Sequence, residues 1–101
     1  EGEKLCSGID SQEYVFALDR VGRQISSEGF ADIIKRCEIE GPYQLVFIIG
    51  GPHGLSEDCR KRADVIVSLS AMTFPHQVAR LILYEQLYRA FTIIRGLPYH
   101  R

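Results

Sequence analysis

The glycine-rich segment Gly50-Gly51-Pro52-His53-Gly54 is the first candidate for ligand binding in this sequence. It stands between an expected strand and an expected helix, and glycines let a backbone approach a ligand closely because they carry no Cβ. A nucleotide phosphate loop is one interpretation, but the patterns GxGxxG and GxxxxGKS or GxxxxGKT are missing. The segment therefore predicts either close backbone contact with another small molecule or only a turn.

A second loop, residues 68–76, mixes hydroxyl groups with apolar side chains such as Met72 and Phe74. Helix capping explains Thr73 and Pro75, but it does not explain apolar side chains in a loop. Such side chains suit an adenine ring that is held by main-chain hydrogen bonds.

The C-terminal third of the chain is locally basic. Residues 1–65 carry eight Lys/Arg and twelve Asp/Glu, whereas residues 66–101 carry four arginines and one acid, Glu85. The overall net charge of -1 argues against indiscriminate nucleic-acid binding. The basic part can hold phosphates or can be an ordinary solvated face.

The elements that must position these loops follow from hydrophobic patterns. Short apolar runs predict buried strands, and apolar residues at helical spacing between capping residues and Gly or Pro predict helices. The predicted strands are 14–18, closed by a turn at Gly22, 45–49 and 65–69. The predicted helices run from the cap Ser26-Ser27 to Gly41-Pro42, from Ser56, and from Pro75 as first residue to Gly96, with Val78, Leu81, Ile82, Leu87 and Phe91 on one stripe.

Alternating strands and helices predict an α/β fold with a parallel sheet and flanking helices, in a single domain of residues 1–101. Ligands of such sheets bind beyond the carboxyl ends of the strands, so we expect the site in the loops after Leu18, Ile49 and Leu69. Three widely spaced cysteines without CxxC predict reduced thiols and no metal site. A charged start and no apolar run of about 18 residues predict a cytoplasmic protein with no membrane partner.

Four ordered motifs make the sequence resemble the RlmH family of the SPOUT superfamily, the pseudouridine N3-methyltransferases of bacterial 23S ribosomal RNA. The motifs are the segment from Phe47 to Leu55, the segment from Ser68 to His76, Glu85-Gln86-Leu87-Tyr88-Arg89-Ala90-Phe91, and Pro98-Tyr99-His100-Arg101. Members of this family begin with an additional strand and helix upstream of the segment that starts here at Glu1. The resemblance therefore suggests an N-terminally shortened chain.

The resemblance implies a homodimeric enzyme that uses S-adenosyl-L-methionine, acts on 23S rRNA within the ribosome, and has a C-terminal trefoil knot. Carried over by position, the cofactor contacts are Leu18, Gly50, Leu69, Ser70, Ala71, Met72, Thr73 and Phe74.

The acceptor, N3 of pseudouridine, must lose a proton, so a base or an anion-stabilising charge is expected. We expect Tyr99, His100 and Arg101 to orient the base, relay the proton and hold phosphate, with Arg89 as a second anion contact; a surface or interface salt bridge is the alternative for Arg89. His76 fits a structural role better.

Two other classes of function remain open. The chain can be a non-catalytic, truncated or minimal knotted dimeric module that keeps the fold, with or without cofactor binding. It can also be an unrelated enzyme that binds a nucleotide through Gly50-Gly51, although no phosphate-loop lysine is present.

Overall fold

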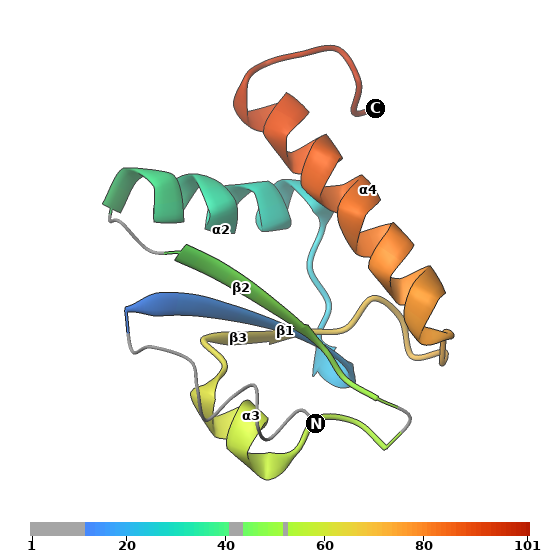
Figure 1. Cartoon of the computed structure of the whole chain (residues 1–101). Coiled ribbons are helices and arrows are strands. Elements are labelled where there is room, and N and C mark those ends of the chain that lie inside the picture. The colour runs from blue at the N-terminus through green and yellow to red at the C-terminus, as the bar shows by residue number, and fades with distance from the viewer. Residues whose placement is uncertain (1–11, 41–43, 52) are drawn as a thin grey trace.

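The computed structural model describes residues 12–40, 44–51 and 53–101. Strands and helices alternate along this part of the chain, and all strand pairs are parallel (Figure 1). The predicted α/β class, with a parallel sheet and flanking helices, is therefore confirmed. The elements are β1 (Glu13–Arg23), α2 (Ser27–Glu40), β2 (Gln44–Ile49), α3 (Glu57–Arg62), β3 (Val65–Val67) and α4 (His76–Ile94).

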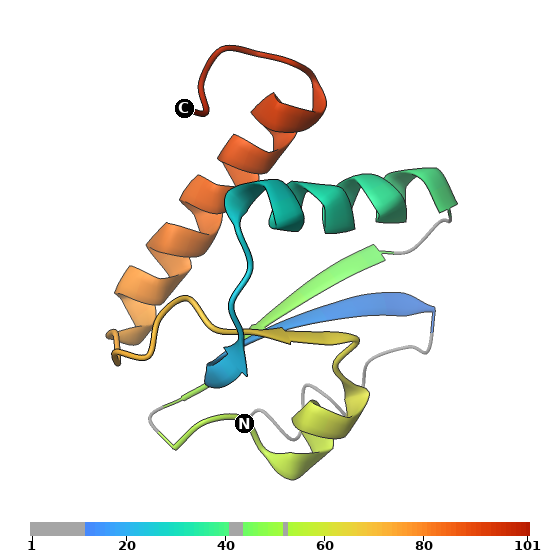
Figure 2. The same ribbon diagram turned by 180° about the vertical axis from the view of Figure 1, so that it is seen from behind.

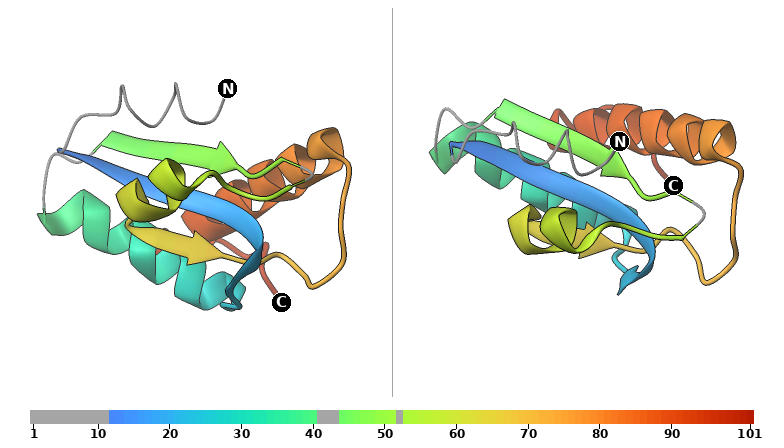
Figure 3. Two further views of the ribbon diagram at one scale, coloured as in Figure 1. Left: turned by 90° about the horizontal axis from the view of Figure 1, so that it is seen from below. Right: turned by 60° about the horizontal axis from the view of Figure 1, so that its bottom comes forward.

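The sheet has the strand order β2-β1-β3, so β1 lies in its centre (Figure 3). Alternate residues of β1 point to opposite faces of the sheet. Phe16 and Leu18 belong to the cluster under α2 and α4, and Val15 and Ala17 belong to the cluster with Cys59 of α3. Both faces of the central strand are therefore buried, as its unbroken apolar sequence requires.

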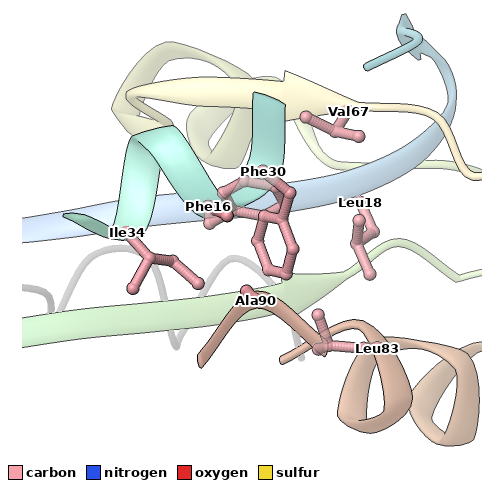
Figure 4. Close-up of a cluster of buried hydrophobic side chains, with 8 residues drawn as sticks. Phe16, Leu18, Phe30, Ile34, Val67, Leu83 and Ala90 are labelled. Carbon is pink, nitrogen blue, oxygen red and sulfur yellow. The ribbon is translucent and has the colours of Figure 1, made fainter. Parts of the chain in front are cut away.

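Helices α2 and α4 cover one face of the sheet, and α3 covers the other (Figures 1 and 3). Phe16 and Phe30 lie at the centre of the larger core cluster, with ring centroids 4.9 Å apart (Figure 4). The ring of Phe47 lies 5.5 Å from that of Phe16. This aromatic contact fixes α2 against the sheet beside the predicted ligand loops.

Two predicted helix caps are present. The Ser26 hydroxyl accepts the N–H of Gly29 at 3.0 Å, and the Ser56 hydroxyl accepts the N–H of Cys59 at 3.2 Å. The predicted start of α4 is wrong by one residue, since Pro75 is the cap residue and the helix begins at His76. The predicted stop at Gly41-Pro42 lies outside the described residues.

The predicted limits of the first and third strands need correction. β1 continues to Arg23, because after Leu18 it pairs again with β3 through Arg23 and Val67, and β3 ends at Val67 rather than at Leu69. Gly22 lies within β1 and does not close it. A Cβ on Gly22 would lie 3.0 Å from the carbonyl oxygen of Ile66, so glycine permits the close approach of the two strands.

The predicted apolar stripe of α4 also needs correction. Val78, Leu81 and Phe91 are exposed, and the helix instead buries Leu83 and Ala90 among others. Apolar residues surround much of this helix, so hydrophobicity alone did not identify the face that packs on the sheet. The exposed large side chains of α4 are Val78, Leu81, Tyr84, Tyr88 and Phe91.

The prediction of reduced thiols holds for Cys37, a buried free thiol of α2. It is wrong for Cys59, which is disulfide-bonded. Spacing along a chain does not show which cysteines meet in space.

Candidate functional site

A cavity of about 350 Å³ lies at the carboxyl ends of the strands, where the loops after β1, β2 and β3 meet. All but one of the predicted cofactor contacts line it: Leu18, Gly50 and residues 69–74 other than Ala71. Ala71 lies in the same loop and is exposed. The fold therefore brings together residues that are more than fifty positions apart in the sequence.

Gly50 brings two walls of this cavity into close contact. Its N–H donates to the carbonyl oxygen of Leu18 at 2.8 Å, and a Cβ on Gly50 would lie 3.1 Å from that same oxygen. The turn that follows is closed by a hydrogen bond from the N–H of Gly54 to the carbonyl oxygen of Gly51 at 2.9 Å. Gly54 has φ +85°, which favours glycine.

The hydroxyl groups of the second loop hold the loop itself. The Ser68 hydroxyl donates to the carbonyl oxygen of Ser70 at 3.0 Å, and the Ser70 hydroxyl accepts the N–H of Met72 at 3.0 Å. The N–H of Ser68 donates to the carbonyl oxygen of Arg23 at 2.7 Å. A ligand in the cavity therefore meets main-chain groups and the apolar side chains of Leu69, Met72 and Phe74.

Asp19 lines the cavity and was missed by the sequence analysis. Its side chain is 5% exposed and pairs with Arg60 of α3. The signal was available, because an acid directly after a buried run that ends a parallel strand lies at the edge where ligands bind.

A second cavity of about 220 Å³ lies between β1, the start of α2 and α4. It shares Leu18, Leu69 and Phe74 with the larger cavity. The Ser27 hydroxyl donates to Oε1 of Gln86 at 2.6 Å in its wall, which joins α2 to α4. The two cavities are therefore neighbours that are separated by apolar side chains.

The C-terminal residues form a cluster with two carboxylates. Arg89 donates from Nε and Nη2 to Oε2 of Glu85 at 3.1 and 2.7 Å, and Nη1 lies 3.0 Å from Nδ1 of His100. The Tyr99 hydroxyl donates to Oε2 of Glu85 at 3.1 Å, and Nε2 of His100 lies 2.7 Å from Oε2 of Glu28. The structure therefore brings Arg89, Tyr99 and His100 together.

Arg101, which was predicted to act with the tail, and His76, for which a structural role was expected, lie outside this cluster. Arg101 is exposed at the end of the chain, and His76 is exposed at the first position of α4. Glu85 and Glu28 were not predicted as partners of the tail. Glu85 was detectable, since it precedes Arg89 by one helical turn.

The partners of His100 assign a donor or acceptor role to each of its ring nitrogens. A guanidinium only donates, so Nδ1 of His100 accepts from Arg89. Nε2 then carries the hydrogen and donates to the Glu28 carboxylate. Both ring nitrogens are engaged, so in this arrangement His100 orients its neighbours and has no free nitrogen for a proton from a substrate.

The carboxylates of the cluster are held in their charged form. Hydrogen bonds from Arg89 lower the pKa of Glu85, and the hydrogen bond from His100 lowers the pKa of Glu28. The Glu85 carboxylate in turn raises the pKa of Arg89 and that of the Tyr99 hydroxyl. Tyr99 therefore stays protonated, while its ring lies 4.9 Å from the Arg89 guanidinium carbon.

The C-terminal tail and the loop that precedes α4 lie at opposite ends of this helix (Figure 2). Arg89 follows His76, the first residue of the helix, by thirteen positions. At about 1.5 Å per residue, this separation is about 20 Å along the helix axis. The two predicted groups of site residues are thus not brought together within one chain.

Comparison with known proteins gives the family. A family model described as "Predicted SPOUT methyltransferase" matches residues 1–100. The chain belongs to the SPOUT methyltransferase family. Within the described residues of this SPOUT chain, no helix is long and apolar enough to span a membrane.

The chain is also similar to proteins named for ribosomal RNA methylation. It is 79% identical over 101 residues to the "Putative ribosomal RNA large subunit methyltransferase H" of Methanospirillum hungatei, with 100% of this chain and 64% of that protein covered. The "Ribosomal RNA large subunit methyltransferase H" of Christiangramia forsetii is 51% identical over 100 residues, with 99% and 64% covered, and that of Carboxydothermus hydrogenoformans is 50% identical over 101 residues, with 100% and 64% covered. The chain therefore spans 64% of the length of these curated relatives.

Proposed function

We propose that this chain is the S-adenosyl-L-methionine-binding part of a cytoplasmic enzyme that methylates large-subunit ribosomal RNA at N3 of a pseudouridine. The observation that carries the proposal is the cavity in which three loops of a SPOUT-family chain bring Leu18, Gly50 and most of residues 69–74 together. The names of the relatives support ribosomal RNA as the substrate class. The pseudouridine and its N3 atom follow from the resemblance in the sequence motifs.

The residues of the cavity fit the proposed cofactor. The main chain at Gly50 forms a wall that a Cβ would fill, and Leu69, Met72 and Phe74 supply apolar surface for an adenine ring. When bound, the cofactor supplies a methyl group on a positively charged sulfur. The residues of this chain would hold the two reactants in line and exclude water, and such positioning is a large source of rate in a transfer of this kind.

The tail would act on a cofactor held by a second copy of the chain. The start of α4 lies next to the cofactor loop, and Arg89 lies about 20 Å further along this helix. Arg89 therefore does not reach the cavity of its own chain. The exposed residues of α4, among them Leu81, Tyr84 and Tyr88, offer an apolar face for a homodimer. Such a dimer brings a tail and a cavity from different chains within reach.

The roles that we propose for the tail follow from its hydrogen bonds. Tyr99 and His100 orient the target base and relay its N3 proton once substrate replaces one of their present partners. Arg89 stabilises the developing anion, and the exposed Arg101 contacts phosphate. Glu85 and Glu28 hold these groups in place before substrate binds.

One observation favours a second function, a dimeric knotted module without turnover. Arg89, Tyr99 and His100 are already engaged by carboxylates, which is the pattern of a structural tail. Cofactor binding without methylation of ribosomal RNA would establish this alternative.

The test is methylation of ribosomes or large subunits by this chain with radiolabelled cofactor. We expect Arg89→Lys and Tyr99→Phe to lower turnover about 100-fold or more, with cofactor affinity within about twofold of the original. Arg95→Lys is the matched control on the same helix, because Arg95 stacks on Phe91 outside the cluster. Equal losses in all three variants, or none, would contradict the proposed roles.

A further inference from the structure

Asp19 and Arg60 form an ion pair in the wall of the large cavity, and the Asp19 carboxylate is the more buried of the two charges. Asp19 follows Leu18 directly, at the point where β1 passes the ends of its neighbours. Its side chain is 5% exposed, whereas that of its partner Arg60 is 38% exposed. The charge is therefore held inside the fold, next to the cavity and away from bulk water.

The contacts of Asp19 connect three separate segments. Oδ2 accepts from Nη2 of Arg60 at 2.5 Å and from the N–H of Leu55 at 3.3 Å, and Oδ1 accepts from the N–H of Val21 at 3.4 Å. Leu55 ends the glycine-rich turn, and Arg60 belongs to α3. One carboxylate thus holds the turn and the helix against the end of β1.

The glycine-rich turn packs directly on this carboxylate. A Cβ built on Gly54 would lie 3.3 Å from Oδ2 of Asp19, and Gly54 has φ +85°. The position of Asp19 therefore fixes the distance between the end of β1 and the residues Gly54 and Leu55. Asp19 and Gly54 both line the cavity, so their contact sets the spacing of two of its walls.

Stability alone does not account for a buried carboxylate at this place. The desolvation of the Asp19 charge offsets much of its attraction to Arg60, and apolar replacements of buried charges in ion pairs are often neutral or stabilising. An ionised carboxylate does supply strong, directional hydrogen bonds to main-chain N–H groups. It is therefore suited to hold a loop in one geometry.

We infer that Asp19 is a positioning residue that presets Gly54 and Leu55 for the cofactor, with Arg60 holding the carboxylate in place. The inference rests on the proposed function, because it gives the turn a cofactor to receive. Asp19 is not one of the predicted cofactor contacts. It would act on the cofactor indirectly, through the main chain of Gly54 and Leu55.

The experiment compares Asp19→Asn with Asp64→Asn. Asp64 is a matched control, since its Oδ2 also accepts a main-chain N–H, that of Val15 at 2.7 Å, and pairs with an arginine, Arg62 at 3.3 Å. It lies near the amino end of β1, away from the cavity. Titration calorimetry with S-adenosylhomocysteine gives the affinity, and amide hydrogen exchange gives the protection of the Leu55 N–H without any ligand.

We expect Asp19→Asn to weaken S-adenosylhomocysteine binding about tenfold or more and to speed exchange at Leu55 by a similar factor. Asp64→Asn should change both quantities by less than about twofold. Unchanged exchange and affinity in a folded Asp19→Asn variant would overturn the inference, and so would equal losses in both variants.

Two further results keep the inference separate from the proposed function. If the original chain binds no S-adenosylhomocysteine, the proposed function fails, and protection of Leu55 still reports whether Asp19 fixes the turn. If Asp19→Asn does not fold, Arg60→Gln is tested instead, because it removes the charged partner of the Asp19 carboxylate at a half-exposed position. If Arg60→Gln then showed the same hydrogen exchange at Leu55 and the same S-adenosylhomocysteine affinity as the unsubstituted chain, the inference would be contradicted.

Discussion

Replacing Gly50 by alanine should push apart two walls of the proposed cofactor cavity. The added methyl would lie 3.1 Å from the carbonyl oxygen of Leu18 and 3.4 Å from main-chain atoms of Gly54 and Leu55. Leu18 is unable to retreat freely, because its oxygen accepts the Gly50 N–H at 2.8 Å. Overpacking of this kind costs about 1–3 kcal/mol.

The expected result for Gly50→Ala is a fall of about 1–3 kcal/mol in the free energy of unfolding, or roughly 4–20 °C in Tm for a chain of this size. Urea and thermal unfolding followed by circular dichroism measure both quantities. Gly51→Ala is the matched control, since among the described residues, its chain neighbours aside, no atom lies within 4 Å of a Cβ at that position. It should leave stability unchanged or raise it by up to about 1 kcal/mol. Equal stability of the two variants would refute this reasoning about the cavity wall.

Three other predictions concern the tail cluster, the core and the free thiol. Because Arg89 lowers the pKa of Glu85, this carboxylate stabilises the fold above its ordinary pKa near 4.5 and loses that contribution as the pH falls through its lowered value. The difference in free energy of unfolding between the unsubstituted chain and Glu85→Gln, measured with urea, should therefore shrink below about pH 4.5. A difference that stays constant with pH would contradict this prediction. Phe16→Ala should lower the free energy of unfolding by about 3–5 kcal/mol, since Phe16 is 2% exposed between two other rings; a loss under about 1 kcal/mol would argue against this packing. Burial raises the pKa of the Cys37 thiol, so iodoacetamide at pH 8 should modify it far more slowly in the folded chain than in urea, and equal rates would show that it is accessible.

Local sequence patterns predicted the elements and the place of the cavity. Ser26 and Ser56 identified helix starts because capping is a contact between near neighbours in the chain. The loops after Leu18 and Ile49 were expected to meet because the carboxyl ends of parallel strands share one edge. These inferences needed no knowledge of distant contacts.

Features that depend on distant contacts were missed or misplaced. The run from Asp19 to Arg23 is polar and mostly exposed, so its pairing with β3 left no hydrophobic signal. Glu28 lies 72 positions from His100, and no local pattern joins them. The buried face of α4 was ambiguous because apolar residues occupy several of its faces. Chemistry that joins two elements therefore became visible only in the folded chain.

The most direct test of the proposed function is titration calorimetry of this chain with S-adenosyl-L-methionine and S-adenosylhomocysteine, together with its mass in solution. We predict saturable binding of both compounds by a dimer, with affinity that Phe74→Ala lowers about tenfold or more through loss of apolar contact in the cavity. A folded chain that binds neither compound would contradict the assignment of the cavity as the cofactor site.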